Sequence, residues 1–109
     1  MSVRLSVYRH RDQPEEVVVD RFPLVIGRSP DADITLDDRW VSRRHCELEM
    51  IDGVIVVRDL GSKHGILVND SPVCESPLQP SDTLNVGLSR VVAVYEKAFV
   101  AEGTAALGS

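Results

Sequence analysis

Residues 46–59, Cys-Glu-Leu-Glu-Met-Ile-Asp-Gly-Val-Ile-Val-Val-Arg-Asp, decide the fold class of this chain. From Cys46 to Met50, apolar side chains alternate with glutamates, which predicts a strand with one face in the core. A second apolar run follows at Val54–Val57. The Asp52-Gly53 pair between the two runs is typical of a tight hairpin turn. We therefore expect two antiparallel strands here.

Short apolar segments separated by turn residues continue along almost the whole chain. No segment keeps a helical period over three turns, and many short strands at regular spacing are typical of a sandwich or barrel. We therefore predict an all-β fold. The strands are expected at Val3–Tyr8, Val17–Val19, Leu24–Ile26, Ile34–Leu36, Cys46–Met50, Val54–Val57, Ile66–Val68, Leu84–Val86 and Val91–Tyr95. Further turns are expected at Ser29–Asp31, Asn69–Pro72 and Gln79–Asp82.

The size and charge of the chain limit its possible functions. Its 109 residues fit one domain, and we expect this domain over residues 1–97, with a flexible tail or linker over 98–109. The net charge of −5 argues against nucleic-acid binding. No stretch approaches the ~20 apolar residues of a membrane helix, and the N-terminal end lacks the apolar block of a signal peptide. We expect a cytoplasmic monomer that binds no membrane.

Four side chains of metal-binding type, Cys46, Cys74, His45 and His64, raise the question of a metal site. They lack the CxxC or HxxxH spacing that such sites use. Cys46 falls on a predicted strand face, and Cys74 lies beside a proline-containing turn. We therefore predict one core thiol and one loop thiol, with no disulfide framework, no metal and no cofactor.

Three polar segments between the predicted strands contain more chemistry than plain connections need. They are Gly27–Ser29, Val41–His45 and Asp59–Gly65. A sandwich gathers alternate loops at one end, so side chains far apart in sequence can meet there. Arginine offers a fork of donors that matches phosphate oxygens, lysine adds a charge, and serine adds a hydroxyl. These segments can form an anion site, although plain solvated loop charges would have the same composition.

The three segments, taken together with their flanks, resemble the forkhead-associated (FHA) domain family. The resemblance covers about four-fifths of the chain and keeps the family's motifs in order at compatible spacing, which makes it far more specific than a lone Gly-Arg pair. The matching stretches are Phe22–Ser29, Asp33–Leu36, Val41–His45, Asp59–Asn69 and Leu78–Gly87.

The resemblance implies a two-sheet β-sandwich of about eleven strands whose loops at one end bind a phosphothreonine-containing partner. Arg28 matches the family arginine that bonds the phosphate, and Ser42 matches the serine that donates to it. Arg43 stands at a position where the family often has a residue that reaches the phosphate or the peptide backbone. Loop support is the implied role of Gly27, His45, Asp59, Gly61, Gly65 and Asn69.

The sequence departs from the commonest family pattern in the third loop. Ser62-Lys63-His64-Gly65 stands where the family typically has Ser-Thr-Asn-Gly. Lys63 replaces a phosphate-binding hydroxyl with a charge, and neutral His64 keeps one donor and one acceptor for the peptide main chain. We therefore expect Lys63 to bind the phosphate, and Ser62 and His64 to contact the peptide.

Two other functions are alternatives to phosphopeptide binding for this sequence. A nucleophilic triad would need Ser42, His45 and Asp59, but no Gly-x-Ser-x-Gly elbow or oxyanion hole accompanies them. We therefore expect no enzyme activity. The stronger alternative is a scaffold of the same fold that binds protein partners without phosphate, for which an exposed Trp40 would suit the surface.

Overall fold

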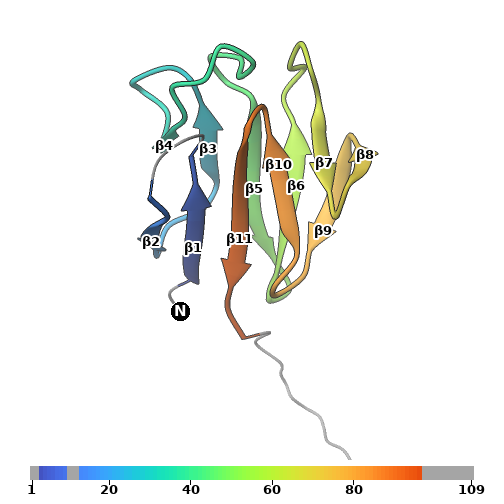
Figure 1. Ribbon diagram of the computed structural model, residues 1–109. Coiled ribbons are helices and arrows are strands. Elements are labelled where there is room, and N and C mark those ends of the chain that lie inside the picture. The colour runs from blue at the N-terminus through green and yellow to red at the C-terminus, as the bar shows by residue number, and fades with distance from the viewer. Residues whose placement is uncertain (1–2, 10–12, 97–109) are drawn as a thin grey trace, which may run out of the picture.

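The computed structural model describes residues 3–9 and 13–96, which form two β-sheets packed face to face (Figure 1). Eleven strands and no helix occur in these two ranges, so the predicted all-β sandwich is confirmed. None of the described segments is a helix that could cross a membrane. The predicted tail at 98–109 lies outside the described residues.

One sheet has six strands in the order β2-β1-β11-β10-β7-β8. Its pairings are antiparallel, and the register of β1 on β11 sets Leu5 opposite Ala93. The strands are β1 (Val3–Tyr8), β2 (Glu15–Val19), β7 (Ile66–Val68), β8 (Ser71–Val73), β10 (Thr83–Val86) and β11 (Ser89–Val94).

The other sheet has five strands in the order β4-β3-β5-β6-β9. Only β3 and β4 run parallel in it, and the remaining pairs are antiparallel. Its strands are β3 (Leu24–Gly27), β4 (Ile34–Thr35), β5 (Cys46–Ile51), β6 (Val54–Asp59) and β9 (Glu75–Leu78).

The hairpin predicted from residues 46–59 is confirmed. Strands β5 and β6 pair from Cys46 opposite Asp59 to Ile51 opposite Val54. The turn between them places Asp52 at φ 52° and Gly53 at φ 80°. Positive φ at both central residues gives the turn that matches the right-handed twist of paired strands.

Two strands, β8 and β9, were missed by the sequence pattern. Ser71-Pro72, expected in a turn, lies in β8, and Glu75–Leu78 was assigned to no strand. Both strands contain a proline and lie at an edge of their sheet. An edge strand tolerates proline because one row of its backbone groups has no strand partner, so an apolar pattern is not required.

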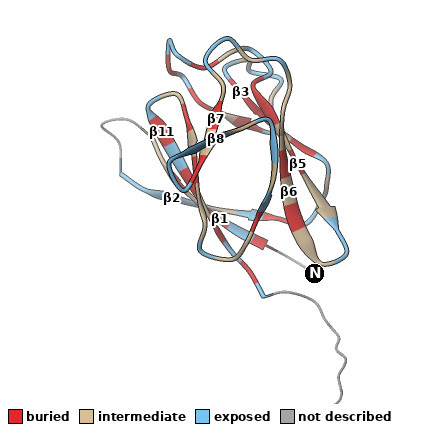
Figure 2. Cartoon of the chain, turned by 90° about the vertical axis from the view of Figure 1, so that its right-hand side faces the viewer, coloured by how far each residue is buried: buried red, intermediate tan, exposed pale blue. Residues whose placement is uncertain are grey.

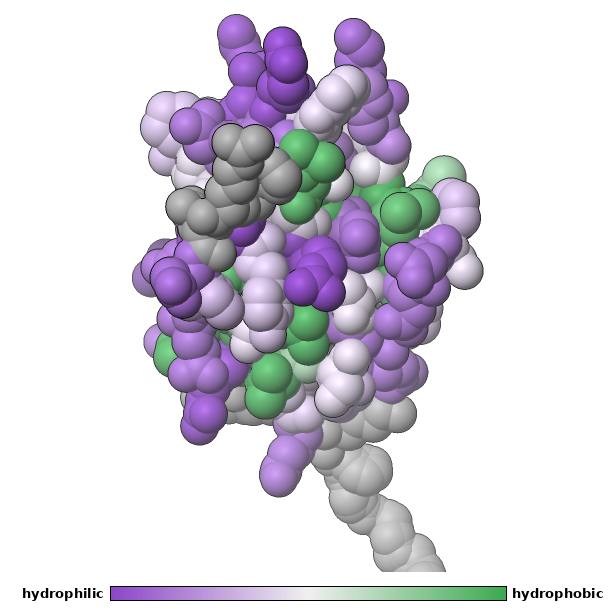
Figure 3. All heavy atoms as spheres, in the orientation of Figure 1, coloured by the Kyte–Doolittle hydropathy of each residue, from purple (hydrophilic) through white to green (hydrophobic). Residues whose placement is uncertain are grey.

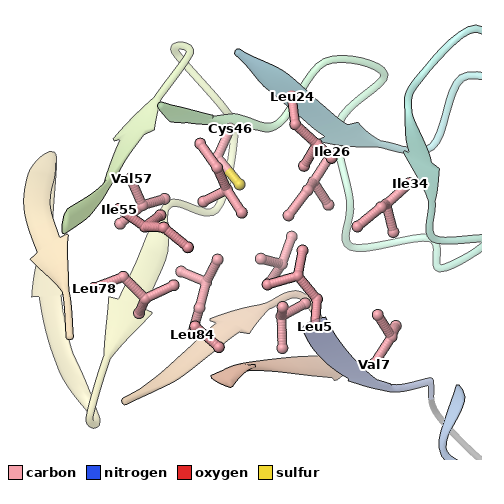
Figure 4. Close-up of a cluster of buried hydrophobic side chains, with 14 of the residues drawn as sticks. Leu5, Val7, Leu24, Ile26, Ile34, Cys46, Ile55, Val57, Leu78 and Leu84 are labelled. Atoms are coloured by element: carbon pink, nitrogen blue, oxygen red, sulfur yellow. The ribbon is translucent and has the colours of Figure 1, made fainter. Parts of the chain in front are cut away.

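The core fills the space between the two sheets (Figure 4). The inward residues of the predicted alternating strands are buried, and the exposed residues are concentrated in the loops and on the outer faces (Figure 2). Cys46 is fully buried, as predicted, and burial together with the charge of Asp59 raises the pKa of its thiol to about 12. Cys74 is exposed. The core thiol is therefore unreactive at neutral pH.

Candidate functional site

The three polar segments meet at one end of the sandwich. The β3–β4, β4–β5 and β6–β7 connections all lie at the upper end of Figure 1, opposite the N-terminus. Hydrophilic residues dominate that end of the surface in Figure 3. The prediction that alternate loops converge is therefore confirmed, and the remaining question is which side chains they bring together.

The end of β3 is fixed against the β4–β5 loop by backbone hydrogen bonds. Arg28 N donates to Ser42 O at 2.9 Å, and Ser29 N donates to Arg43 O at 3.2 Å. A Cβ at position 27 would lie 2.0 Å from Arg43 O. Only glycine allows this close approach between the end of β3 and the β4–β5 loop.

Arg28 is exposed, and its guanidinium is only partly used by the protein. Its Nε donates to Val41 O at 3.1 Å, which aims the side chain along the β4–β5 loop. Its terminal NH groups make no ion pair with a carboxylate in the described part of the chain. A planar fork held at its base with its terminal donors open is suited to bind an oxyanion.

His45 joins the second loop to the third. The imidazole is fully buried; its Nδ1 accepts from Ser42 N at 3.0 Å, and its Nε2 lies 2.7 Å from Gly65 O. This pattern requires the tautomer with the proton on Nε2. Both ring nitrogens are thus engaged with backbone groups, which leaves His45 no nitrogen with which to activate Ser42 as a nucleophile.

The third loop is organised by Asp59. Its carboxylate accepts from the backbone NH groups of Gly61 and Ser62, each at 3.2 Å, and from the Ser62 hydroxyl. Gly65 N then donates to Ser62 Oγ at 2.9 Å. Gly61 and Gly65 both adopt φ +78°. The Ser62 hydroxyl is therefore occupied within the loop, which favours loop support; its expected contact with the peptide stays a prediction.

The Ser42 hydroxyl, unlike that of Ser62, donates no hydrogen bond within the described part of the chain. Its Oγ accepts from Lys63 N at 3.1 Å, which holds the hydroxyl oxygen while leaving its proton available to a ligand. The same bond places the backbone of Lys63 beside Ser42. Residues that are 21 positions apart in sequence are therefore adjacent in the site.

A shallow depression of about 280 Å³ lies over these residues. Three cations and no carboxylate line it, so its local charge is opposite to that of the whole chain. The lining residues are Arg28, Arg39, Trp40, Val41, Ser42, Lys63 and His64.

Four of the six predicted ligand contacts line this depression, and two do not. Arg43 lines a separate depression with Arg28, Ser29 and Pro30, while Ser62 faces Asp59. Arg39 joins the site although the sequence did not single it out as a site residue. Its position in the Asp37-Asp38-Arg39 run gave no motif signal.

Asp38 was also missed, and it sets the position of the second loop. Its carboxylate accepts from Trp40 N at 2.9 Å and from Leu88 N, in the β10–β11 turn, at 2.6 Å. Trp40 is 44% exposed, and its ring packs edge-on against His64 with centroids 5.0 Å apart. Trp40 is thus exposed, while its backbone amide is held by Asp38 and its ring by His64.

Asn69, the last of the predicted residues, does not line the depression. Asn69 bonds Asp82 Oδ1 at 3.0 Å and accepts from Thr83 N at 3.0 Å, so it supports the turn before β10. No cluster of three or more metal-ligating side chains occurs among the residues that the structure describes. Arginine and lysine side chains, together with the Ser42 hydroxyl, allow the loop end to bind an anion.

Comparison with known proteins agrees with this architecture. A family model described as FHA domain matches residues 24–87. Glycogen accumulation regulator GarA of Mycolicibacterium smegmatis is 38% identical over 91 residues, which cover 84% of this chain and 58% of that protein. The oxoglutarate dehydrogenase inhibitor of Corynebacterium efficiens is 37% identical, with coverage of 84% and 64%. The chain thus spans less than two thirds of the length of these relatives.

Solved structures give the same fold. An FHA domain studied for its phosphothreonine-dependent interactions superposes with a TM-score of 0.78 at 31% identity, covering 88% of this chain and 98% of that one. The FHA domain of FhaA, solved in complex with the intracellular domain of Rv3910, gives 0.75 at 32% identity, with coverage of 84% and 98%.

Proposed function

The chain belongs to the forkhead-associated domain family, and on this premise we propose that its loop end binds a phosphothreonine-containing protein. Arg28, Ser42 and Lys63 hold the phosphate, and Arg39 adds a further cation. His64 contacts the peptide beside the phosphate. The binding domain spans residues 1–97 and acts as a cytoplasmic monomer, without catalysis and without binding nucleic acid or membrane.

One observation carries this proposal. The depression over the Ser42 hydroxyl is lined by Arg28, Arg39 and Lys63 and by no acidic residue, in a chain of net charge −5. A phosphate carries about −1.5 to −2 charges and three acceptor oxygens, which match several cationic donors and one hydroxyl. Hydrogen bonds to a charged group contribute about 1.5 to 3 kcal/mol each, so three or four of them account for most of the roughly 8 kcal/mol of a micromolar complex.

The test compares Arg28→Ala with Arg44→Ala by fluorescence anisotropy on a phosphothreonine peptide library. Both variants lose one exposed loop arginine, but Arg44 lines neither the depression over Ser42 nor the one beside Arg43. Arg28→Ala should weaken binding by roughly a hundredfold, and Arg44→Ala by less than about threefold. Equal losses would mean a diffuse positive surface and would contradict the assigned site.

The relatives suggest how such binding is used. Their names describe a regulator of glycogen accumulation and an inhibitor of oxoglutarate dehydrogenase. We infer that this chain likewise regulates a partner by docking to it after a Ser/Thr kinase has phosphorylated that partner. Co-purification of a partner that is lost after phosphatase treatment is the expected result.

A phosphate-independent scaffold is the second candidate, favoured by the exposed apolar side chains beside the depression. Trp40 and Leu88 are 44% and 51% exposed, and both are held through their backbone amides by Asp38. A partner that binds equally well after phosphatase treatment, and that Trp40→Ala releases, would favour this candidate.

A further inference from the structure

His64 stands where three surface depressions meet. It lines the depression over Ser42, a more apolar one of about 240 Å³ beside Leu88, and a third of about 370 Å³ beside Cys74. In the commonest family pattern this position holds an asparagine, whose amide does not titrate near neutral pH. The imidazole of His64 therefore brings to the rim of the phosphate site a group that can change its charge.

The two histidines that the structure describes differ in how their ring nitrogens are used. In His45, Nδ1 accepts from Ser42 N at 3.0 Å and Nε2 lies 2.7 Å from Gly65 O. The His64 side chain is exposed, and neither of its nitrogens forms a hydrogen bond within residues 3–9 and 13–96. Both nitrogens of His64 are therefore available to a ligand: as one donor and one acceptor when the ring is neutral, and as two donors when it is protonated.

The position of the His64 ring is fixed before any ligand arrives. The ring packs edge-on against Trp40, with centroids 5.0 Å apart and an interplanar angle of 74°, and Trp40 N donates to the Asp38 carboxylate at 2.9 Å. The backbone of the preceding residue is also held, because Lys63 N donates to Ser42 Oγ at 3.1 Å. A ligand therefore meets a ring that is already placed beside the Ser42 hydroxyl, which lowers the entropic cost of the contact.

The charged and titratable groups that face His64 are three cations and a thiol. Arg28 comes from the end of β3, Arg39 from the β4–β5 loop and Lys63 from the same loop as His64, while Cys74 lies between β8 and β9. The depression beside Leu88 adds no titratable group, and no carboxylate lines any of the three. A protonated His64 thus has no counter-charge among these lining groups. A bound phosphate, with about −1.5 to −2 charges, supplies one and favours the imidazolium.

We propose that His64 takes up a proton when the phosphopeptide binds and holds the ligand as an imidazolium. The proton comes from the solvent and adds to the ring nitrogen that carried none, and no bond of the ligand breaks. One N–H group then donates to a phosphate oxygen, and the other donates to a main-chain carbonyl of the peptide beside it. The inference rests on the proposed phosphothreonine binding and gives His64 a role in it that an asparagine could not perform.

Proton uptake makes the affinity depend on pH in a defined direction. Because coupling between two bound species is reciprocal, a ligand that favours the protonated ring is itself bound more tightly once the ring is protonated. Histidine ordinarily changes charge at about pH 6.5, and phosphothreonine loses its second proton at about pH 6. Affinity should therefore rise as the pH falls from about 8 to about 6.5, and should fall again below about pH 6, where the phosphate gains a proton.

The experiment compares the whole chain with its His64→Asn variant by titration calorimetry, using a phosphothreonine peptide that contains no histidine. Titrations at about pH 7 in two buffers of different ionisation enthalpy give the number of protons exchanged; the unmodified chain should take up about half a proton more than the variant. The ratio of the two affinities should rise about fourfold from about pH 8 to about pH 6.5. Protons exchanged by the phosphate and by His45 occur in both titrations and cancel. Equal proton numbers and a constant ratio would overturn the inference.

A neighbouring cation and a spectroscopic signature assign the proton to His64. Lys63→Gln removes a charge that does not titrate in this range, so it should weaken binding at every pH and retain the proton uptake; loss of the uptake in this variant would overturn the assignment to His64. The ¹⁵N spectrum of the His64 ring at about pH 7 should move toward that of an imidazolium with the phosphopeptide and stay unchanged with the unphosphorylated peptide. A ring that stays neutral in the complex would overturn the inference.

The failure of this inference can be told apart from the failure of the proposed function. If the phosphothreonine peptide binds no better than its unphosphorylated form at any pH, the phosphothreonine site itself is wrong. If that peptide binds in a phosphate-dependent manner and His64→Asn exchanges the same number of protons, only the role given to His64 is wrong.

Discussion

The outer face of the five-stranded sheet and the loop end of the sandwich use their charges in opposite ways. On the sheet, Arg58 lies within 3.2 to 3.5 Å of carboxylate oxygens from Glu47, Glu49 and Glu75, and the hydrogen bond with Glu75 is the main cause of its raised pKa. At the loop end, Arg28 has no such partner in the described chain. The sheet neutralises its own cation, and the loops leave theirs for a ligand.

The loop carboxylates explain how this is possible. Asp33 accepts from Val25 N at 2.8 Å, Asp38 from two backbone amides, and Asp59 from two amides and a hydroxyl. These acids hold the backbone and make no ion pair with the arginines beside them. Acidic residues can therefore shape a cationic site without neutralising it.

The frame of the loop end should be the feature most sensitive to change. His45→Ala removes a fully buried ring and leaves two part-buried backbone groups, Ser42 N and Gly65 O, without their partner, so we expect a loss of about 3 kcal/mol in the free energy of unfolding. His64→Ala, which alters an exposed ring in the same region, should cost below about 0.5 kcal/mol. Urea denaturation measures both, and similar losses would contradict the role given to His45.

A change in the peptide, and not in the protein, should have the next largest effect. Replacing phosphothreonine by aspartate in the peptide should weaken binding by about tenfold to a hundredfold, because a carboxylate has one charge and two oxygens. Titration calorimetry with the two peptides measures the difference. Equal affinity would mean that the loop cations respond to negative charge in general and do not form a phosphate site.

A smaller effect tests the carboxylates that shape the loops. Asp38→Ala removes the acceptor for Trp40 N and Leu88 N, and we expect a loss of about 1 to 3 kcal/mol in stability together with weaker peptide binding. Asp37→Ala changes the same charge at the exposed neighbouring position. If that control weakens binding as much as Asp38→Ala does, charge is responsible and the loop anchor is not.

The smallest effect belongs to the sheet. Arg58→Ala removes an exposed cation whose partners are its own glutamates, so phosphopeptide affinity should stay within about twofold. Anisotropy with the same peptide measures this. A loss comparable to that of Arg28→Ala would erase the distinction between the two regions.

Much of the fold was predictable because it depends on local patterns. The alternation at Cys46–Met50 and the Asp52-Gly53 turn are local signals, and they identify the hairpin without any knowledge of tertiary contacts. Strands β8 and β9 were not predicted because they contain prolines and polar residues, which are tolerated at the edge of a sheet. Which strands lie at an edge depends on how the sheets are arranged. Composition alone does not encode that arrangement.

Site residues that lie within a family motif could be predicted from the sequence. Residues whose role depends on a contact with a distant part of the chain could not. Arg28, Ser42 and Lys63 were identified from the resemblance and do line one depression. Asp38 was not, because its partner Leu88 N lies 50 residues away and a carboxylate beside Asp37 looks like a solvated loop charge. Arg43, assigned to the phosphate, lines a separate depression with Arg28, and its contact with the phosphate stays a prediction.

Amide chemical-shift mapping with a phosphothreonine peptide and with its unphosphorylated form shows whether Arg28, Ser42 and Lys63 form the phosphate site. We expect large, phosphate-dependent shifts for the amides of Arg28, Ser42 and Lys63, and none for Arg58 and its neighbours on β5 and β9. Shifts that cluster on the sheet face, or that are the same with the unphosphorylated peptide, would contradict it.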